Sequence, residues 1–267
     1  TYSLVMVGTF LTRSGVLSSV HAFAQSAIGP LFFVFIGLTL AGSLGLLLWR
    51  WNDLRSEGEM HSLLSREALF LLNNLLFMGI LIVCFWGVFF PLISELFTGQ
   101  KVTVGPPFYE RATAPLFGGL LLLMGIAPLS AWGHSTVKTL GKAVWKPALG
   151  AVAALVAAYI FGVRLPAALI GFFAVALVIF VTLYEYIRGV SARRRRSGES
   201  YPVALMRLAA RNRRRYGGYI IHLGVVLMAL GIIGIELFQT ETQGTLARGQ
   251  SLELDGYTVR YDSLAIF

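Results

Sequence analysis

Two histidines in this 267-residue chain lie where an imidazole could do chemistry. His222 follows Tyr216 by six residues inside the uncharged stretch Tyr216–Ile235, about 9 Å along a helix. An ionisable side chain within a membrane span is costly, and it usually faces a cavity, a cofactor or a partner. His222 is therefore a candidate axial ligand. The competing interpretation is a neutral histidine that donates a hydrogen bond to another helix.

On a helical wheel, the residues around His222 predict open space beside its side chain. Small side chains neighbour it on its own face: Gly218, Val225 and Ala229. Three glycines recur every seven residues on nearly the opposite face: Gly217, Gly224 and Gly231. Such a stripe predicts close packing of another helix behind the histidine. Open space on the histidine's face and close packing on the opposite face suit a histidine that is an axial ligand and has a bulky ring beside it.

His21 is the second candidate, in an unusual connection between two apolar stretches. Ser14 has the side chain of a helix N-cap. Four later residues share one helical face: Leu17, Val20, His21 and Ala24. The pattern predicts a short helix over about Ser14–Ala24 at the outer membrane surface, with His21 on its apolar side. The other histidines, His61 and His134, lie among polar residues and are expected to be solvated.

The elements that must position these histidines are long and apolar. Apolar residues make up 56% of the chain, and six stretches contain no Asp, Glu, Lys or Arg: Ala22–Trp49, Ala68–Ser94, Ala112–Val137, Pro147–Val163, Leu165–Tyr184 and Tyr216–Ile235. A bilayer core needs roughly 20 apolar helical residues, and a helix satisfies its own backbone hydrogen bonds in lipid. The sequence predicts an all-α polytopic membrane helix bundle.

The two ends of the chain differ from these six stretches. Thr1–Phe10 is apolar but too short to span, so it is interpreted as the last half of a helix in a fragment. The bundle is predicted over residues 1–237, with seven crossings of which the first is truncated. Ser251–Asp262 contains two alternating runs joined by Asp255-Gly256, a strong hairpin signal. Residues 238–267 are predicted to start an outside β-domain.

Positive charge predicts the orientation. The expected inside loops, Arg50–Arg66, Gly133–Lys146 and Arg188–Arg215, hold 16 of the 22 Lys and Arg residues. An excess of positive residues marks cytoplasmic loops, so His21 is expected on the outer side. This distribution accounts for the net charge of +9 without nucleic acid, because no base-stacking pattern or binding motif accompanies it.

Two outside connections carry prolines. The expected loop Glu95–Ala114 contains Gly105 followed by two prolines, which predict a stiff turn that no helix runs through. The connection around Arg164 and Pro166 is only a few residues long. It predicts a tight antiparallel pair of helices.

Four stretches resemble the CcmF family, the haem lyase subunits of system I cytochrome c maturation. They occur in the family's order: Phe10–Ala24, Ser65–Asn74, Val104–Tyr109 and Tyr219–Gly224. The first is the most specific, since Phe-Leu-Thr-Arg-Ser-Gly-Val-Leu-Ser-Ser-Val-His-Ala-Phe-Ala closely resembles the segment after the family's tryptophan-rich signature. A sister subunit serving multihaem nitrite reductase would look nearly the same.

The resemblance implies roles for both histidines. His21 matches an outward-facing histidine that is an axial ligand to transient haem at the outer face. His222 matches the second transmembrane histidine, which binds a permanent b-type haem through its iron. The tryptophan-rich loop and the first histidine of each pair precede Thr1 in the family pattern. Each haem site is thus represented by one ligand of two, and the fragment alone is expected to be inactive.

The resemblance also implies a reaction, partners and a location. The family attaches haem to apocytochrome c by forming thioethers between haem vinyl groups and Cys-X-X-Cys-His thiols. The implied partners are apocytochrome c, other maturation subunits, a haem chaperone, membrane lipid and quinol, in the bacterial inner membrane. Two other classes stay open. One is a transporter or channel in which His222 gates or relays protons, and the other is a structural membrane-assembly subunit.

Overall fold

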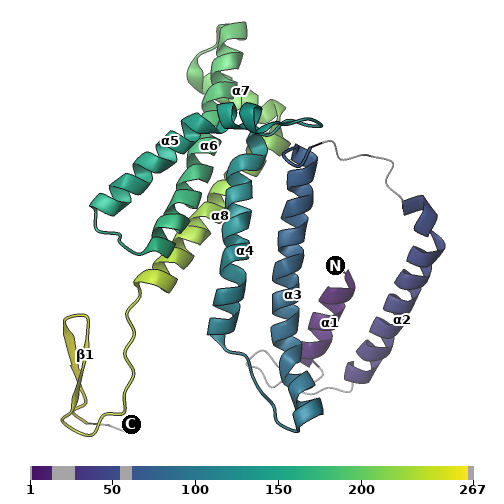
Figure 1. Cartoon of the computed structure of the whole chain (residues 1–267), viewed down its shortest axis with the longest axis vertical. Helices are drawn as coiled ribbons and strands as arrows, with labels where there is room; N and C mark the ends of the chain where they lie inside the picture. Colours follow the sequence, from purple (N-terminus) through teal and green to yellow (C-terminus); the bar gives the residue numbers. More distant parts are fainter. Residues whose placement is uncertain (1, 14–27, 55–61, 264–267) are drawn as a thin grey trace. The chain divides into compact units, whose positions relative to one another are not determined.

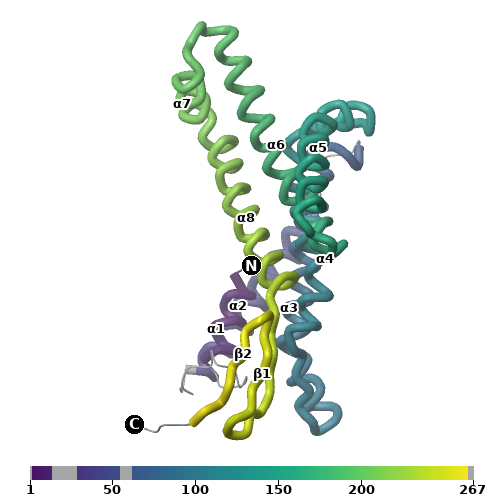
Figure 2. Tube along the Cα trace, turned by 90° about the vertical axis from the view of Figure 1, so that its left-hand side faces the viewer, coloured from purple at the N-terminus to yellow at the C-terminus, as the bar shows by residue number. Residues whose placement is uncertain are grey.

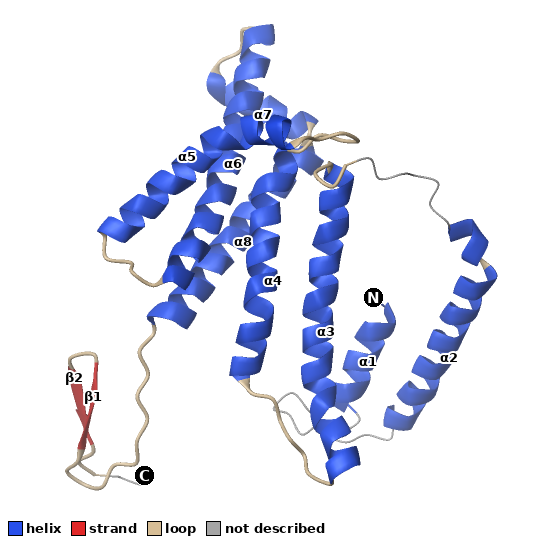
Figure 3. Cartoon of the chain, viewed as in Figure 1, coloured by secondary structure: helices blue, strands red, loops and turns tan. Residues whose placement is uncertain are grey.

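The computed structural model describes residues 2–13, 28–54 and 62–263, which are dominated by helices (Figures 1 and 3). Six of the described helices are long and apolar enough to cross a membrane. The predicted class, an all-α polytopic membrane bundle, is confirmed for this part of the chain. The chain divides into two compact units, residues 1–59 and residues 60–267.

The first unit contains a helix pair. Helix α1 (Tyr2–Arg13) packs against α2 (Ile28–Trp49), and a 3-10 turn η1 (Trp51–Leu54) follows. The rings of Phe10 and Phe33 join the two helices, with centroids 6.0 Å apart. The predicted truncated crossing corresponds to α1, whose 12 residues are about 18 Å long and too short for a bilayer core.

The second unit is a bundle built around one central helix. Its helices are α3 (Arg66–Thr98), α4 (Pro106–Ile126), η2 (Ala127–Leu129), α5 (Val137–Ile160), α6 (Pro166–Ser197), α7 (Tyr201–Arg211) and α8 (Arg213–Phe238). Helix α6 packs against α4, α5, α7 and α8, while α3 packs against α4 (Figures 1 and 2). The predicted close pair is confirmed, since α5 and α6 are joined by the five residues 161–165 and pack against each other.

The core of the second unit follows two sides of α6. On one side, residues of α6 pack with Ala151 of α5: Ala176, Leu177 and Val181. On another side, Val175 and Val178 pack with Val226 of α8. Small and β-branched side chains let the helices approach closely in a membrane, where no hydrophobic force draws them together. Helix α8 is therefore held mainly by α6.

The predicted loop Glu95–Ala114 is wrong at both ends. Helix α3 continues to Thr98, and α4 begins directly at Pro106 with Gly105 as its N-cap. Proline fits the first turn of a helix because its missing N–H would have no partner there. The two prolines therefore start a helix, and only residues 99–105 form the connection.

Two of the three predicted inside loops, Gly133–Lys146 and Arg188–Arg215, are also largely helical. Helix α5 starts at Val137, after a capping box between Thr136 and Thr139, and carries three lysines. Helix α6 continues through the arginine run to Ser197 and ends at Gly198, whose φ of 66° is left-handed. Absence of charge marks where a chain can enter lipid, but Lys and Arg are good helix formers, so the helices continue past those limits.

The predicted hairpin is confirmed. Strand β1 (Ser251–Leu254) pairs antiparallel with β2 (Tyr257–Arg260), so that Leu254 lies opposite Tyr257. Asp255 and Gly256 form the turn with φ values of 45° and 82°, which a two-residue hairpin of this hand requires. Whether residues 238–267 start a larger domain stays a prediction.

Candidate functional site

His222 lies beside the face that α8 presents to α6. The residues of α8 that are buried are Tyr216, Tyr219 and Val226, spaced three and seven apart along one side of the helix. His222 follows Tyr219 by three residues, so it borders the same side and is half-buried. The packing of α8 on α6 thus fixes the height and the direction of this imidazole.

The two nitrogens of the His222 ring have no hydrogen-bond partner among the described residues. Nδ1 is buried and unpartnered, and no hydrogen bond from a described residue reaches Nε2. The nearest ring is that of Tyr219, which meets the imidazole edge to face with centroids 6.2 Å apart. A buried polar nitrogen without a partner is costly. His222 therefore differs from a histidine whose ring nitrogens are hydrogen-bonded to other helices of the same bundle.

The glycines of α8 are unpacked. A Cβ built on Gly217, Gly224 or Gly231 would meet no other atom within 4 Å. The prediction that this stripe packs against another helix is therefore wrong for the described part of the chain. The space next to Gly218, on the histidine's side, is equally open. Among the described residues, α8 packs against α6 and α7, and its glycine side is uncovered.

A buried carboxylate of α6 contacts Tyr219, the tyrosine that neighbours His222. Glu185 of α6 is only 4% exposed and forms an ion pair with Arg215 at the start of α8. The hydroxyl of Tyr219 donates to the same carboxylate oxygen at 3.3 Å. Arg188 adds a second, more distant contact at 3.6 Å. Tyr219 therefore touches Glu185 with its hydroxyl group and His222 with its ring.

The sequence did contain a signal for Glu185. It is the one carboxylate within α6, and it directly follows the uncharged stretch that ends at Tyr184. A single acid at the end of a span, close to a strongly basic segment, needs a cationic partner if it is buried. Its distance of 30 residues from Arg215 concealed the pair until the fold was known.

Aromatic side chains complete the contact between α6 and α8. The hydroxyl of Tyr186 donates to the backbone carbonyl of Tyr216 at 2.7 Å. The Tyr186 ring also lies 5.1 Å from the Tyr216 ring and 5.9 Å from the Tyr219 ring. Gly189 permits this approach, because a Cβ there would overlap the hydroxyl of Tyr216. These contacts hold the first two turns of α8 firmly on α6.

Of the other histidines that the sequence analysis names, only His134 lies among the described residues. His21 and its expected helix, Ser14–Ala24, lie outside the described residues, as does His61. His134 is exposed in the turn before α5, as expected for a solvated side chain. In the described ranges no group of three or more His, Cys, Asp or Glu side chains could hold a metal ion.

The chain is similar to curated bacterial proteins along nearly all of its length. It is 32% identical over 265 residues to the cytochrome c-type biogenesis protein CycK of Bradyrhizobium diazoefficiens, covering 99% of this chain and 40% of that protein. It is 33% identical over 258 residues to CcmF of Pseudomonas fluorescens, covering 96% and 37%. The probable biogenesis protein NrfE of Escherichia coli is 41% identical over 128 residues, covering 47% and 22%.

No family model matches the chain, and no solved structure matches it. The chain spans about 40% of the length of the curated relatives that it matches along its whole length. Its long apolar helices and these bacterial relatives identify it as a multi-pass protein of the bacterial inner membrane. The chain belongs to the CcmF family of cytochrome c-type biogenesis proteins.

Proposed function

We propose that the intact protein attaches haem to apocytochrome c, and that this chain supplies His222 as one axial ligand of a permanent b-type haem. The relatives are named for cytochrome c biogenesis, which supports the maturation role. The observation that carries the ligand assignment is the half-buried imidazole of α8, whose ring nitrogens have no hydrogen-bond partner among the described residues.

The residues around His222 fit such a ligand. Neutral imidazole is a common axial ligand of haem iron. The α6 side of the ring is occupied by Tyr219, while the neighbouring Gly218 leaves open space that a side chain would otherwise fill. Because Nδ1 is buried, Nε2 is the nitrogen we assign to the iron. We assign the second ligand to the part of the family pattern that precedes Thr1, where the resemblance places the first transmembrane histidine.

The residues of this chain would hold and orient the ligand. Tyr219 limits rotation of the imidazole on one side, and Glu185 and Arg215 hold Tyr219 in place through its hydroxyl group. A bound haem supplies one-electron chemistry, and the protein determines its position and electronic surroundings. The contacts between α6 and α8 would therefore set the ligand's geometry before any cofactor arrives.

His21 has a different proposed role. We assign it, by the family motif in Phe10–Ala24, to haem held transiently at the outer face. Apocytochrome c, other maturation subunits, a haem chaperone and quinol are the proposed partners. The two histidines would then act at different depths of the membrane, one in attachment and one in a resident site.

Two variants of the intact protein separate these roles. His222→Ala should lower the haem content measured as pyridine haemochrome, whereas His21→Ala should leave it unchanged and abolish haem-stained c-type cytochrome in cells. His134→Ala is the matched control, because this exposed histidine precedes α5 and belongs to neither motif in the sequence. Full haem content in His222→Ala would refute the ligand assignment. Normal maturation in His21→Ala would make that residue merely interfacial.

A further inference from the structure

A strongly basic surface extends from the end of α6 to the start of α8. Residues 188–215 carry ten arginines and one carboxylate, Glu199. Arg193 donates to Glu199 at 2.8 Å and Arg207 at 2.6 Å, so that carboxylate is fully engaged. Six arginines have no carboxylate within 4.0 Å among the described residues: Arg194, Arg195, Arg196, Arg211, Arg213 and Arg214. Their charge requires compensation from outside this part of the chain.

Helix α7 lies within this basic segment and has an apolar outer face. Ala204 is fully buried, and α7 packs on α6. The opposite side of the helix is apolar and exposed, with Met206 at 70%, Leu205 at 42% and Val203 at 39% exposure. A helix with one apolar face and flanking arginines is typical of an element that lies in a membrane interface. Nothing in the described residues covers this face.

The lengths of the neighbouring helices place α7 at the depth of the lipid headgroups. Ser197 lies seven residues beyond Val190, the last buried apolar residue of α6, about 10.5 Å along the helix. Arg213 lies three residues before Tyr216, or about 4.5 Å. The headgroup layer extends roughly 5–8 Å beyond the hydrocarbon core. Helix α7 connects these two heights, as Figure 2 shows, so it crosses that layer.

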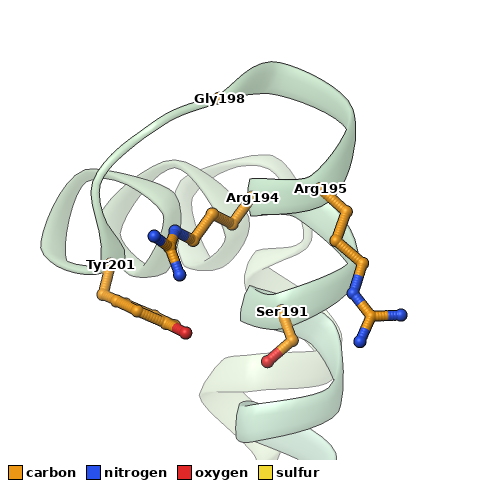
Figure 4. A pocket seen from close by; sticks show the side chains of 5 residues that line it. All are labelled: Ser191, Arg194, Arg195, Gly198 and Tyr201. Carbon is orange, nitrogen blue, oxygen red and sulfur yellow. The ribbon is translucent and has the colours of Figure 1, made fainter.

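A cavity of about 490 Å³ lies at the turn between α6 and α7 (Figure 4). It is lined by Ser191, Arg194, Arg195, Gly198 and Tyr201. The guanidinium group of Arg194 lies 4.2 Å from the centre of the Tyr201 ring, which fixes its direction. Guanidinium groups bind phosphate oxygens in a bidentate manner. Figure 4 shows the Arg194 side chain directed towards Tyr201 and the Arg195 side chain directed away from both, so each guanidinium group offers its own donors to a phosphate.

We propose that residues 188–215 form a docking surface for acidic phospholipid, with α7 inserted by its apolar face and headgroup phosphates at Arg194 and at Arg195. Acidic lipid attracts arginines close to a span. It also supplies the apolar medium that Met206 and Leu205 need, which nucleic acid does not. The surface would hold the connected ends of α6 and α8 at a fixed height, independently of any haem.

The stability of the protein in nanodiscs tests the charge part of this proposal. Adding about 30% phosphatidylglycerol to phosphatidylcholine should raise the Tm by about 2–4 °C. The combined variant Arg194→Gln, Arg195→Gln and Arg196→Gln should lose this rise. The matched control Lys138→Gln, Lys142→Gln and Lys146→Gln removes equal charge from exposed positions of α5 and should keep it. Equal Tm values in both lipids, or equal losses in both variants, would overturn the proposal.

The position of α7 is tested by a spin label at Met206→Cys in a Cys84→Ser background. In vesicles with phosphatidylglycerol, the label should be accessible to oxygen and protected from a water-soluble nickel reagent. A label at Arg196→Cys, on the last turn of α6, should show the opposite behaviour. Free access of the nickel reagent to position 206 in these vesicles, which contain no other protein, would overturn lipid docking and point to a protein partner instead.

Discussion

The phenol ring of Tyr219 meets the imidazole of His222 edge to face, with the two centroids 6.2 Å apart. The hydroxyl of the same tyrosine donates to the buried carboxylate of Glu185, which Arg215 neutralises. A residue of the central helix α6 is thus connected through one tyrosine to the candidate ligand on α8. Substitutions that break the contacts of Tyr219 or Glu185 should change the measured stability of the bundle, whether or not haem is bound.

The ion pair between Glu185 and Arg215 should contribute to folding. Arg215→Gln removes the main partner of a carboxylate that is 4% exposed. Breaking a buried pair costs several kcal/mol, but the arginine is half exposed, so we expect a loss of about 1–2 kcal/mol. Thermal unfolding in detergent measures it. Arg188→Gln is the control, since the Arg188 side chain is 67% exposed and lies 3.6 Å from the Glu185 carboxylate, so its loss should cost little. Equal losses in the two variants would contradict the assignment.

The close approach of α6 to α8 at Gly189 should not tolerate a side chain. Gly189→Ala would place a methyl group against the Tyr216 hydroxyl and a Leu208 methyl group. Overpacking of this kind costs about 1–3 kcal/mol, which should appear as a lower Tm. Gly224→Ala is the matched control on α8, where a Cβ meets nothing within 4 Å. That variant should be neutral or stabilising in this chain, because alanine favours helix.

The same glycine control carries information about the intact protein. If Gly224→Ala destabilises the longer protein but not this chain, a helix outside the described residues packs on the stripe of Gly217, Gly224 and Gly231. The original prediction of a packing stripe would then hold in that context.

The turn between α6 and α7 should loosen in acid. Arg193, and then Arg207, hold the pKa of Glu199 down from 4.5 to about 2. A carboxylate with a lowered folded pKa stabilises the native state above its unfolded pKa, and this contribution is lost as pH falls from 4.5 towards 2. The Tm difference between the protein and Glu199→Gln should therefore be constant at neutral pH and shrink below pH 4.5. A difference that does not change with pH would contradict the pairing.

The predicted orientation can be tested without haem. A reporter inserted within Ala192–Ser200 should behave as cytoplasmic, and one fused after Gln250 should behave as external. The physical reason is the concentration of arginines in residues 188–215. Protease protection of the two reporters in sealed vesicles is the measurement. The opposite pattern would overturn the charge argument and place His21 on the wrong side for cytochrome c assembly.

The features that the sequence predicted correctly depend on local patterns. Uncharged apolar stretches located the long helices, and Asp255-Gly256 located the hairpin turn, because both signals lie within a short window. The limits of the helices were missed, since Pro106 and the arginines after Ile187 are compatible with helix once the chain leaves lipid. Those limits depend on capping residues such as Gly105 and Gly198.

The features that the sequence did not predict depend on contacts between distant residues. The pair of Glu185 with Arg215 joins positions 30 residues apart, and no periodicity within one helix indicates it. The prediction that the glycine stripe of α8 packs against another helix was wrong for the same reason. A row of glycines shows that another helix could approach closely, and it does not show which element packs there. Helix α8 uses Tyr216, Tyr219 and Val226 instead.

The most direct test of the central claim is a rescue experiment at His222 in the intact protein. His222→Gly should abolish the reduced-minus-oxidised absorbance of the b-type haem, and free imidazole should restore it by occupying the vacated position. The protein should remain folded, because the contacts of α8 with α6 run through Tyr216, Tyr219 and Val226. An unchanged spectrum in His222→Gly before imidazole is added would show that this histidine is not a haem ligand.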